Sequence, residues 1–281
     1  MITTRSTVRR RLFGLSLALL PLMLSQSAAA KDPRELVIGT SVGPYADQVK
    51  LGIKPILEKQ GYKVKVVEFS DYIQPNFALA EGALDINIFQ HIVYLRQFAS
   101  EHKLAITDLI TIPTAPIAIY SKKHKSLNEV REGSVIAMPN DPTNQARALV
   151  LLDQLGWIQL RAKIDPLRAS EKDIAANLKK VKLVALEAAQ LPRSLQDCDF
   201  SFVNGNFALA SGLKLTDALI TEKISPNYIN LVAVRSADKD KQFARDIVAA
   251  YRSKAFLDYT NQYLQGYAKT EYQLAQGSST R

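Results

Sequence analysis

Short apolar runs alternate with helical patterns along most of the chain. Runs rich in Val, Ile and Leu predict strands at residues 35–40, 63–69, 84–89, 116–121, 134–138, 182–187, 199–203 and 227–235. Near-continuous apolar runs indicate strands covered on both faces, as in parallel sheets. Apolar stripes at helical spacing predict helices within 46–60, 143–155 and 239–264, and Pro55 should displace the first of them locally. The pattern therefore predicts an α/β fold.

Two features favour two lobes over a single sheet. The segment TIPTAPIAIYSKK (111–123) has two prolines around a strand, which suits an edge or a crossing between lobes. The strand at 228–235 is followed only by helical patterns, so we expect the C-terminus to pack back on the first lobe. Exported α/β chains with two crossings are often hinged ligand binders, an analogy that needs evidence from a site.

The first thirty residues have the features of a cleaved export signal. Four arginines precede an apolar run at 12–24, and Ala residues at 28 and 30 form an A-x-A end. The run is too short to span a membrane as a helix. No cysteine lies near the expected cleavage point, so we expect no lipid anchor. The arginine run at 9–11 is not followed by a further twin-arginine consensus, so we favour the general secretory route over twin-arginine export. Part of the net charge of +9 belongs to this signal, and the rest forms no cluster typical of nucleic-acid binding.

The residues with chemical potential give little support to catalysis or to a metal. Cys198 is the single cysteine, so no internal disulfide forms, and a buried filler is favoured over a catalytic thiol. The three histidines are His91, His102 and His124, and none lies at a spacing typical of a metal site. P-loop and dinucleotide-binding motifs are absent from the sequence, and the residues show no apparent nucleophile–base pair. We therefore expect a protein that binds no cofactor and no metal and has no enzymatic activity.

The segment NDPTNQARALVLL (140–152) predicts a helix that begins with Asp141 as the N-cap and Pro142 at the first position. Arg147 then lies near the positive end of the helix dipole, where a cation loses a few tenths of a kcal/mol. A guanidinium there could form a bidentate clamp for a carboxylate. The alternative is an ordinary surface arginine, and the residues alone leave both open.

Two asparagines lie where a ligand could dock. In FVNGNFALASG (202–212), Asn204 follows a predicted strand at its carboxyl end, and Gly205 permits the turn. Asn230 lies within or before the strand at 227–235, where asparagine is disfavoured unless it has a role. An asparagine both donates and accepts, which suits the zwitterionic head of an amino acid. Each signal alone is weak.

A group of aromatic residues follows the predicted strand at 84–89. Phe89, His91 and Tyr94 lie at its carboxyl end, and Tyr72 lies at the comparable end of the preceding strand. Four rings at strand ends would form a largely apolar slot that suits a thioether or a flexible aliphatic side chain. The alternative is a histidine satisfied within an aromatic core.

Several of these segments together resemble the methionine-binding NlpA lipoprotein family, the substrate-binding components of methionine ABC importers. The resemblance is carried by four stretches in the family's order, namely EFSDYIQPNFALAEGALDINIFQHIVYL, YSKKHKSLNEVREGSVIAMPNDPTNQARALVLL, LVALEAAQLPRSL and FVNGNFA. It implies a periplasmic-binding-protein fold of the type II kind, with two α/β lobes joined by two crossing segments. It implies that Arg147 holds the ligand carboxylate and that Asn204 and Asn230 bind the amino-acid head. It also implies that Tyr72, Phe89, His91 and Tyr94 surround the methionine side chain.

The resemblance also implies an organisation and a function. Residues 1–30 would be the signal, 31–115 with 232–281 the first lobe, and 116–231 the second lobe. The expected protein is a monomeric periplasmic receptor that delivers L-methionine or a close relative to an inner-membrane ABC permease and ATPase. The alternative is a receptor of the same class with another cargo: another amino acid, a methionine derivative or a methionine-containing dipeptide. Family members often carry a lipid-anchored cysteine, whereas this signal ends in AAA, so we expect a protein free in the periplasm.

Overall fold

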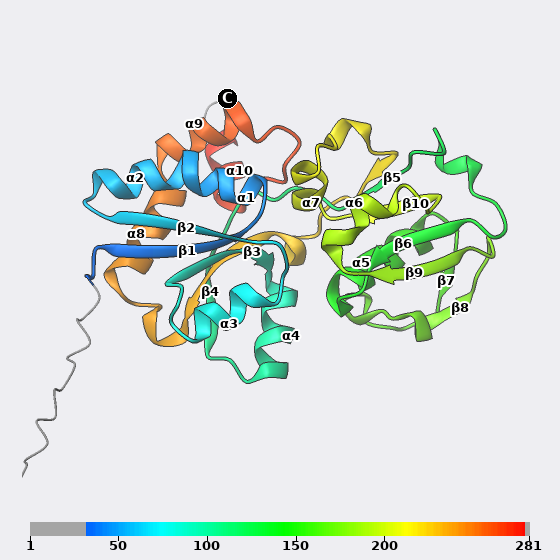
Figure 1. Ribbon diagram of the computed structural model, residues 1–281, viewed down its shortest axis with the longest axis horizontal. Helices are drawn as coiled ribbons and strands as arrows, with labels where there is room; N and C mark the ends of the chain where they lie inside the picture. Colours follow the sequence, from blue (N-terminus) through cyan, green and yellow to red (C-terminus); the bar gives the residue numbers. More distant parts are fainter. Residues whose placement is uncertain (1–31, 279–281) are drawn as a thin grey trace, which may run out of the picture. The chain divides into compact units, whose positions relative to one another are not determined.

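The computed structural model describes residues 32–278, which are built around two five-stranded sheets (Figure 1). The strand orders are β2-β1-β3-β12-β4 and β11-β5-β10-β6-β9. Both sheets belong to one compact unit that begins at Pro33. The predicted signal at 1–30 lies outside the described residues. Each sheet carries helices and forms one α/β lobe, as predicted.

The first sheet combines parallel and antiparallel pairs. Its strands are β1 (Glu35–Ser41), β2 (Lys63–Phe69), β3 (Ile86–His91), β4 (Ile106–Thr111) and β12 (Asn230–Arg235). β1 pairs in parallel with β2 and β3, whereas β12 runs antiparallel between β3 and β4. The chain thus returns from the second lobe into the middle of the first sheet.

The helices of the first lobe come from both ends of the described chain. They are α1 (Pro44–Asp47), α2 (Lys54–Lys59), α3 (Gln74–Ala80), α4 (Ile92–His102), α8 (Gln242–Tyr251), α9 (Lys254–Tyr263) and α10 (Glu271–Ser278). Ile247 of α8 and Phe256 of α9 are fully buried in one core with Ile38 of β1. The C-terminal helices therefore pack on the first sheet.

The first predicted helix changes its winding before Pro55. A π-helical turn, Gln48–Ile53, lies between α1 and α2. Pro55 has no N–H to donate to the preceding turn, so the regular helix must restart near it. Side chains of this region contact the first crossing segment: the Tyr45 hydroxyl accepts from Ala115 N at 3.2 Å, and Gln48 Nε2 donates to Pro113 O at 2.9 Å.

The second lobe repeats the α/β plan with shorter strands. Its sheet comprises β5 (Ala118–Tyr120), β6 (Val135–Pro139), β9 (Lys182–Leu186), β10 (Phe200–Val203) and β11 (Ile220–Thr221). β7 (Gln159–Leu160) and β8 (Ile174–Ala176) form a separate ribbon. The helices are α5 (Pro142–Gln154), α6 (Leu191–Ser194) and α7 (Gly205–Ala210). β6 pairs in parallel with β9 and β10, and β5 runs antiparallel to β10 and β11.

Two chain segments cross between the sheets side by side. The first joins β4 to β5 and the second joins β11 to β12. Ile112 N donates to Asn230 O at 2.8 Å, and Glu222 N donates to Ile117 O at 3.0 Å. The crossing segments are therefore hydrogen-bonded to each other near both lobes.

Several details differ from the sequence-based predictions. The strands β4, β7, β8 and β11 were not predicted, although the apolar residues of β4 pair with β12. Gly205 has no left-handed backbone and opens α7 instead of forming a turn. A Cβ at this position would lie 2.5 Å from Ala115 Cβ and 2.6 Å from Pro116 O, so the glycine is required for close approach to the first crossing segment.

Candidate functional site

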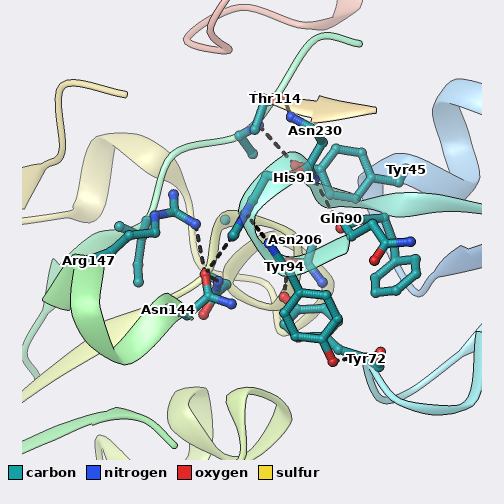
Figure 2. A pocket seen from close by; sticks show the side chains of 15 residues that line it. Tyr45, Tyr72, Gln90, His91, Tyr94, Thr114, Asn144, Arg147, Asn206 and Asn230 are labelled. Atoms are coloured by element: carbon teal, nitrogen blue, oxygen red, sulfur yellow. Dashed lines mark hydrogen bonds between the residues drawn. The ribbon is translucent and has the colours of Figure 1, made fainter. Parts of the chain in front are cut away.

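A pocket lies between the two lobes, and we call it the interlobe pocket (Figure 2). Its lining residues are Tyr45, Tyr72, Phe89, Gln90, His91, Tyr94, Thr114, Ala115, Ile117, Asn144, Arg147, Asn204, Gly205, Asn206 and Asn230. They come from strand ends and helix starts of both lobes and from the first crossing segment. Such a junction of strand ends is where α/β folds place ligands.

The first lobe contributes a wall of rings, formed by Tyr72, Phe89 and Tyr94. The Tyr72 and Phe89 ring centres are 5.7 Å apart and nearly parallel, and each lies 6.1 Å from Tyr94 in an edge-on arrangement. The Tyr94 hydroxyl donates to Tyr72 O at 2.9 Å. These contacts hold the rings in defined positions beside the pocket, with spacings typical of favourable aromatic pairs.

His91 has a structural reason for its place after the strand. It is the last residue of β3 and the N-cap of α4, where its Nδ1 accepts from Tyr94 N at 3.2 Å. The proton of the neutral ring is therefore on Nε2, which faces Asn144 Oδ1 of the second lobe at 3.5 Å. Burial and the nearby Arg147 guanidinium hold the pKa of His91 well below its usual value. His91 is thus a neutral donor toward the pocket.

The second lobe contributes Arg147 from the second turn of α5, and its side chain is buried. Only 7% of the residue is exposed, so the surface-arginine alternative is wrong. Its Nε donates to Glu222 Oε2 at 3.2 Å and its Nη2 donates to Glu222 Oε1. The guanidinium also lies 4.7 Å from the centre of the Tyr228 ring, a cation–π contact. Burial acts against the charge, but Glu222 outweighs it and the pKa of Arg147 lies above its usual value.

Asn144 connects the polar side chains of the pocket. Its Nδ2 donates to both carboxylate oxygens of Asp141, each at 3.0 Å, and this fixes the direction of its amide. Its Oδ1 accepts from Arg147 Nη1 at 2.8 Å and from Asn204 Nδ2 at 3.1 Å. Burial raises the pKa of Asp141, whose carboxylate also accepts from Asn144 N as the N-cap of α5. The start of α5 therefore orients donors from three elements.

Direct contacts join the two sides of the pocket. The Tyr72 hydroxyl donates to Asn206 Oδ1 of α7 at 2.6 Å, and Asn206 Nδ2 donates to Ser41 Oγ of β1 at 3.2 Å. Asn230 opens β12, where its Nδ2 donates to Phe89 O at 3.0 Å and its N donates to Thr114 Oγ1 at 2.8 Å. In Figure 2, Asn144 and Arg147 reach the pocket from α5, and Tyr45 and Asn230 line another side of it.

Comparison with known proteins gives this arrangement a family. The model of the NlpA lipoprotein family matches residues 36–271. The chain belongs to the NlpA lipoprotein family.

Individual relatives match most of the length of this chain. The D-methionine-binding lipoprotein MetQ of Salmonella typhi is 39% identical over 240 residues, which are 84% of this chain and 88% of that one. A nutrient-binding protein from Burkholderia cenocepacia, solved bound to methionine, is 40% identical with a TM-score of 0.79, over 84% of this chain and 99% of that one. A periplasmic substrate-binding protein of an ABC transporter from Coxiella burnetii is 38% identical with a TM-score of 0.77, over 83% and 99%. These matches confirm the predicted family and the predicted two-lobed fold.

All seven side chains predicted for the site line the interlobe pocket, namely Tyr72, Phe89, His91, Tyr94, Arg147, Asn204 and Asn230. Their contacts with a ligand stay a prediction. Sequence reasoning missed Tyr45, Asn144, Asn206 and Glu222. The spacing of Asp141, Asn144 and Arg147 along one helix was the available signal for Asn144, since residues three apart share a helix face.

Cys198 lies outside the interlobe pocket. It is buried against Leu191 and Leu195, and burial raises the pKa of its thiol. Within residues 32–278, no group of three or more His, Cys, Asp or Glu side chains is arranged to hold a metal ion. No helix in that same part of the chain is long and apolar enough to cross a membrane.

Proposed function

We propose that this protein is the periplasmic substrate-binding component of an ABC importer, and that it binds methionine or a close relative in the interlobe pocket. The observation that carries the proposal is that a buried arginine of the second lobe and a wall of rings of the first lobe line the same pocket. An amino acid with a long apolar side chain has matching parts for both. The curated relative of Salmonella typhi is named for D-methionine binding, and the solved relative of Burkholderia cenocepacia holds methionine.

The polar side chains support recognition of an amino-acid head. Arg147 offers a guanidinium for the carboxylate. Asn204 Oδ1 is buried and has no hydrogen-bond partner among the described residues, so it is an acceptor for an ammonium group. Asn230 lies at the same pocket through the start of β12. Together these groups can satisfy both charges of a zwitterion.

The ring wall supports an apolar, polarizable side chain. Phe89 and Tyr94 are 4% and 7% exposed, so a side chain beside them is removed from water. A thioether sulfur gains about 0.3–1.5 kcal/mol from an aromatic neighbour. His91, as a neutral donor, adds no charge to this part of the pocket. This wall therefore suits methionine better than a charged side chain.

The proposed mechanism is closure of two lobes on the ligand. We assign β1 to β4 with β12 to the first lobe, β5 to β11 to the second, and the hinge to the two crossing segments. A ligand that contacts both walls stabilises the closed arrangement by its additional contacts there. The Tyr72–Asn206 hydrogen bond is one contact that forms across the lobes.

A binding panel tests the function. Isothermal titration and thermal shift with L-methionine, D-methionine, norleucine and glycyl-methionine rank the cargo and its stereochemistry. Saturation at ~100 times the dissociation constant should add roughly 2.7 kcal/mol to the free energy of unfolding. A shift with another compound and none with either methionine would select a different cargo, and no shift with any amino acid or dipeptide would reject the proposal.

The proposal also covers catalysis, partner and location. We expect methionine to be recovered unchanged after long incubation, and the Cys198→Ala variant to bind as the wild type does. We expect a monomer that docks on a membrane permease with its ATPase, in the periplasm after removal of residues 1–30. Uptake of labelled methionine in a deletion strain, with and without the complementing gene, tests the partner. Fractionation of the cells tests the location and whether the protein is free of the membrane.

A further inference from the structure

Glu222 occupies a special place in the second crossing segment. It directly follows β11, and only 11% of its side chain is exposed. Its Oε1 accepts from Ile117 N of the first crossing segment at 2.8 Å. Both of its oxygens also accept from Arg147, through Nε and Nη2. The carboxylate therefore joins the two crossing segments to the buried guanidinium.

This pairing makes the interlobe pocket electrically balanced. Arg147 is the one lining residue with a permanent charge among the described residues of the pocket, and Glu222 compensates it. His91 is neutral because burial and Arg147 hold its pKa well below its usual value. Asp141 lies behind Asn144 at the positive start of α5, where it accepts from Asn144 N and Nδ2 and from Thr143 Oγ1. The lining side chains together with Glu222 thus carry no net formal charge.

We propose that Glu222 determines which ligand charge the pocket accepts: balanced by Glu222, Arg147 selects a zwitterion with no net charge and rejects a carboxylate that lacks the ammonium group. This inference rests on the proposed function and names the charge class of the ligand. It assigns a role to a side chain that does not itself line the pocket.

The physical reason is the cost of burying net charge. An unpaired arginine in this position would attract any carboxylate, including anions such as 2-hydroxy and 2-oxo acids, because the ligand charge would neutralise it. With Glu222 in place, an anion leaves one uncompensated negative charge inside the closed pocket, whereas a zwitterion leaves none. Discrimination between a zwitterion and an anion thus depends on Glu222, which Arg147 does not need in order to bind a carboxylate.

A competing role for Glu222 gives a different expectation. The carboxylate could occupy Arg147 only until the ligand carboxylate displaces it. Removing Glu222 would then help every ligand with a carboxylate by the same factor, since each would escape the same competition. The ratio between two such ligands separates the two roles, because only charge balance changes that ratio.

The test compares methionine with its 2-hydroxy analogue, which keeps the carboxylate and the thioether and replaces the ammonium by a hydroxyl. Dissociation constants for both are measured by titration calorimetry on the wild type and on Glu222→Gln. Glutamine keeps an oxygen that accepts from Ile117 N, so the variant removes mainly the charge. We expect the preference for methionine over the 2-hydroxy acid to fall at least about tenfold in Glu222→Gln. The matched control is Glu187→Gln, an exposed acid outside the interlobe pocket, which should keep the wild-type preference.

The outcomes separate this inference from the proposed function. A wild type that binds no methionine-class amino acid contradicts the proposed function. A wild type that binds methionine, together with an unchanged preference in Glu222→Gln, overturns the role of Glu222 and leaves the function standing. Should Glu222→Gln not fold, the double variant Arg147→Gln/Glu222→Gln removes both charges and leaves none unpaired. There both ligands should lose affinity together, and a tenfold loss of the preference in that variant would overturn the inference.

Discussion

The two walls of the interlobe pocket are built by different physics. The ring wall of the first lobe consists of Tyr72, Phe89 and Tyr94. Contacts between the rings, whose centres lie about 6 Å apart, hold it in place more than hydrogen bonds do. The polar wall of the second lobe, Asn144, Arg147 and the partner Glu222, is held by short hydrogen bonds that converge on a few atoms. Both walls are buried, but only the second carries formal charge.

This difference predicts where substitutions will matter most. Packing contacts are many and individually weak, so replacing one ring removes only part of the binding energy of the ring wall. Removing one partner of a buried, hydrogen-bonded charge pair breaks the whole interaction and leaves the other group unpaired. We therefore expect the polar wall to dominate affinity and the ring wall to adjust it.

The largest expected effect comes from breaking the polar wall at its centre. Arg147→Ala should weaken methionine binding by about 2–5 kcal/mol, the usual scale for removing one partner of a buried charged pair. It should also lower the free energy of unfolding, because Glu222 stays in place with its carboxylate uncompensated. Titration calorimetry measures the first effect and urea unfolding the second.

A second variant separates the two effects of Arg147. Arg147→Ala/Glu222→Ala leaves no unpaired charge, so stability should recover while binding stays weak. Arg168→Ala is the control, because the Arg168 side chain is 86% exposed and lies outside the interlobe pocket. Binding by Arg147→Ala within about twofold of wild type would exclude the clamp.

His91 lies where the two walls meet, and its protonation should make the free energy of unfolding depend on pH. Its pKa is held well below its usual value near 6.5, so the folded protein keeps it neutral while the unfolded chain takes up a proton. Stability from this group is complete above about pH 6.5 and is lost as pH falls toward the folded pKa, at up to ~1.4 kcal/mol per pH unit. Urea unfolding from pH 7 down to pH 5 measures the slope.

His91→Asn provides the comparison for that slope. Asparagine is a good N-cap and can accept from Tyr94 N, but it does not titrate. The difference between the two proteins isolates one proton, because their carboxylates are the same. The variant should show a shallower loss of stability between pH 6.5 and 5, and equal slopes would mean that His91 is not held neutral.

The ring wall could be predicted from sequence because its signal is local. Phe89, His91 and Tyr94 follow one apolar run within a few residues, and Tyr72 follows another. The carboxyl ends of the parallel strands β1, β2 and β3 meet at one edge, which brings these residues together. Strand periodicity therefore gave the lobe and placed these rings at strand ends. Only the family resemblance favoured a pocket over an aromatic core, and β4 was missed beside the prolines of the first crossing segment.

The polar wall was only half predictable because its partners are remote in sequence. Arg147 stood out by its unfavourable place near a helix start, but Glu222 lies 75 residues away in a segment without regular periodicity. Tyr45 contacts the first crossing segment through Ala115, 70 residues away in sequence, a pairing that apolar stripes do not encode. Pairings that depend on two crossing segments lying side by side require the folded chain.

The smallest effect should come from the one hydroxyl that joins the ring wall to α7. Tyr72→Phe removes the 2.6 Å hydrogen bond to Asn206 Oδ1 and keeps the ring contacts, so methionine binding should weaken by about 0.5–1.5 kcal/mol. Tyr120→Phe is the matched control, since the Tyr120 hydroxyl is buried and has no hydrogen-bond partner among the described residues. Calorimetry on both variants compares the Tyr72 hydroxyl, which hydrogen-bonds across the lobes, with the Tyr120 hydroxyl, which does not. Equal changes in the two would mean that the hydroxyl of Tyr72 contributes nothing to closure, and that the ring wall acts by packing alone.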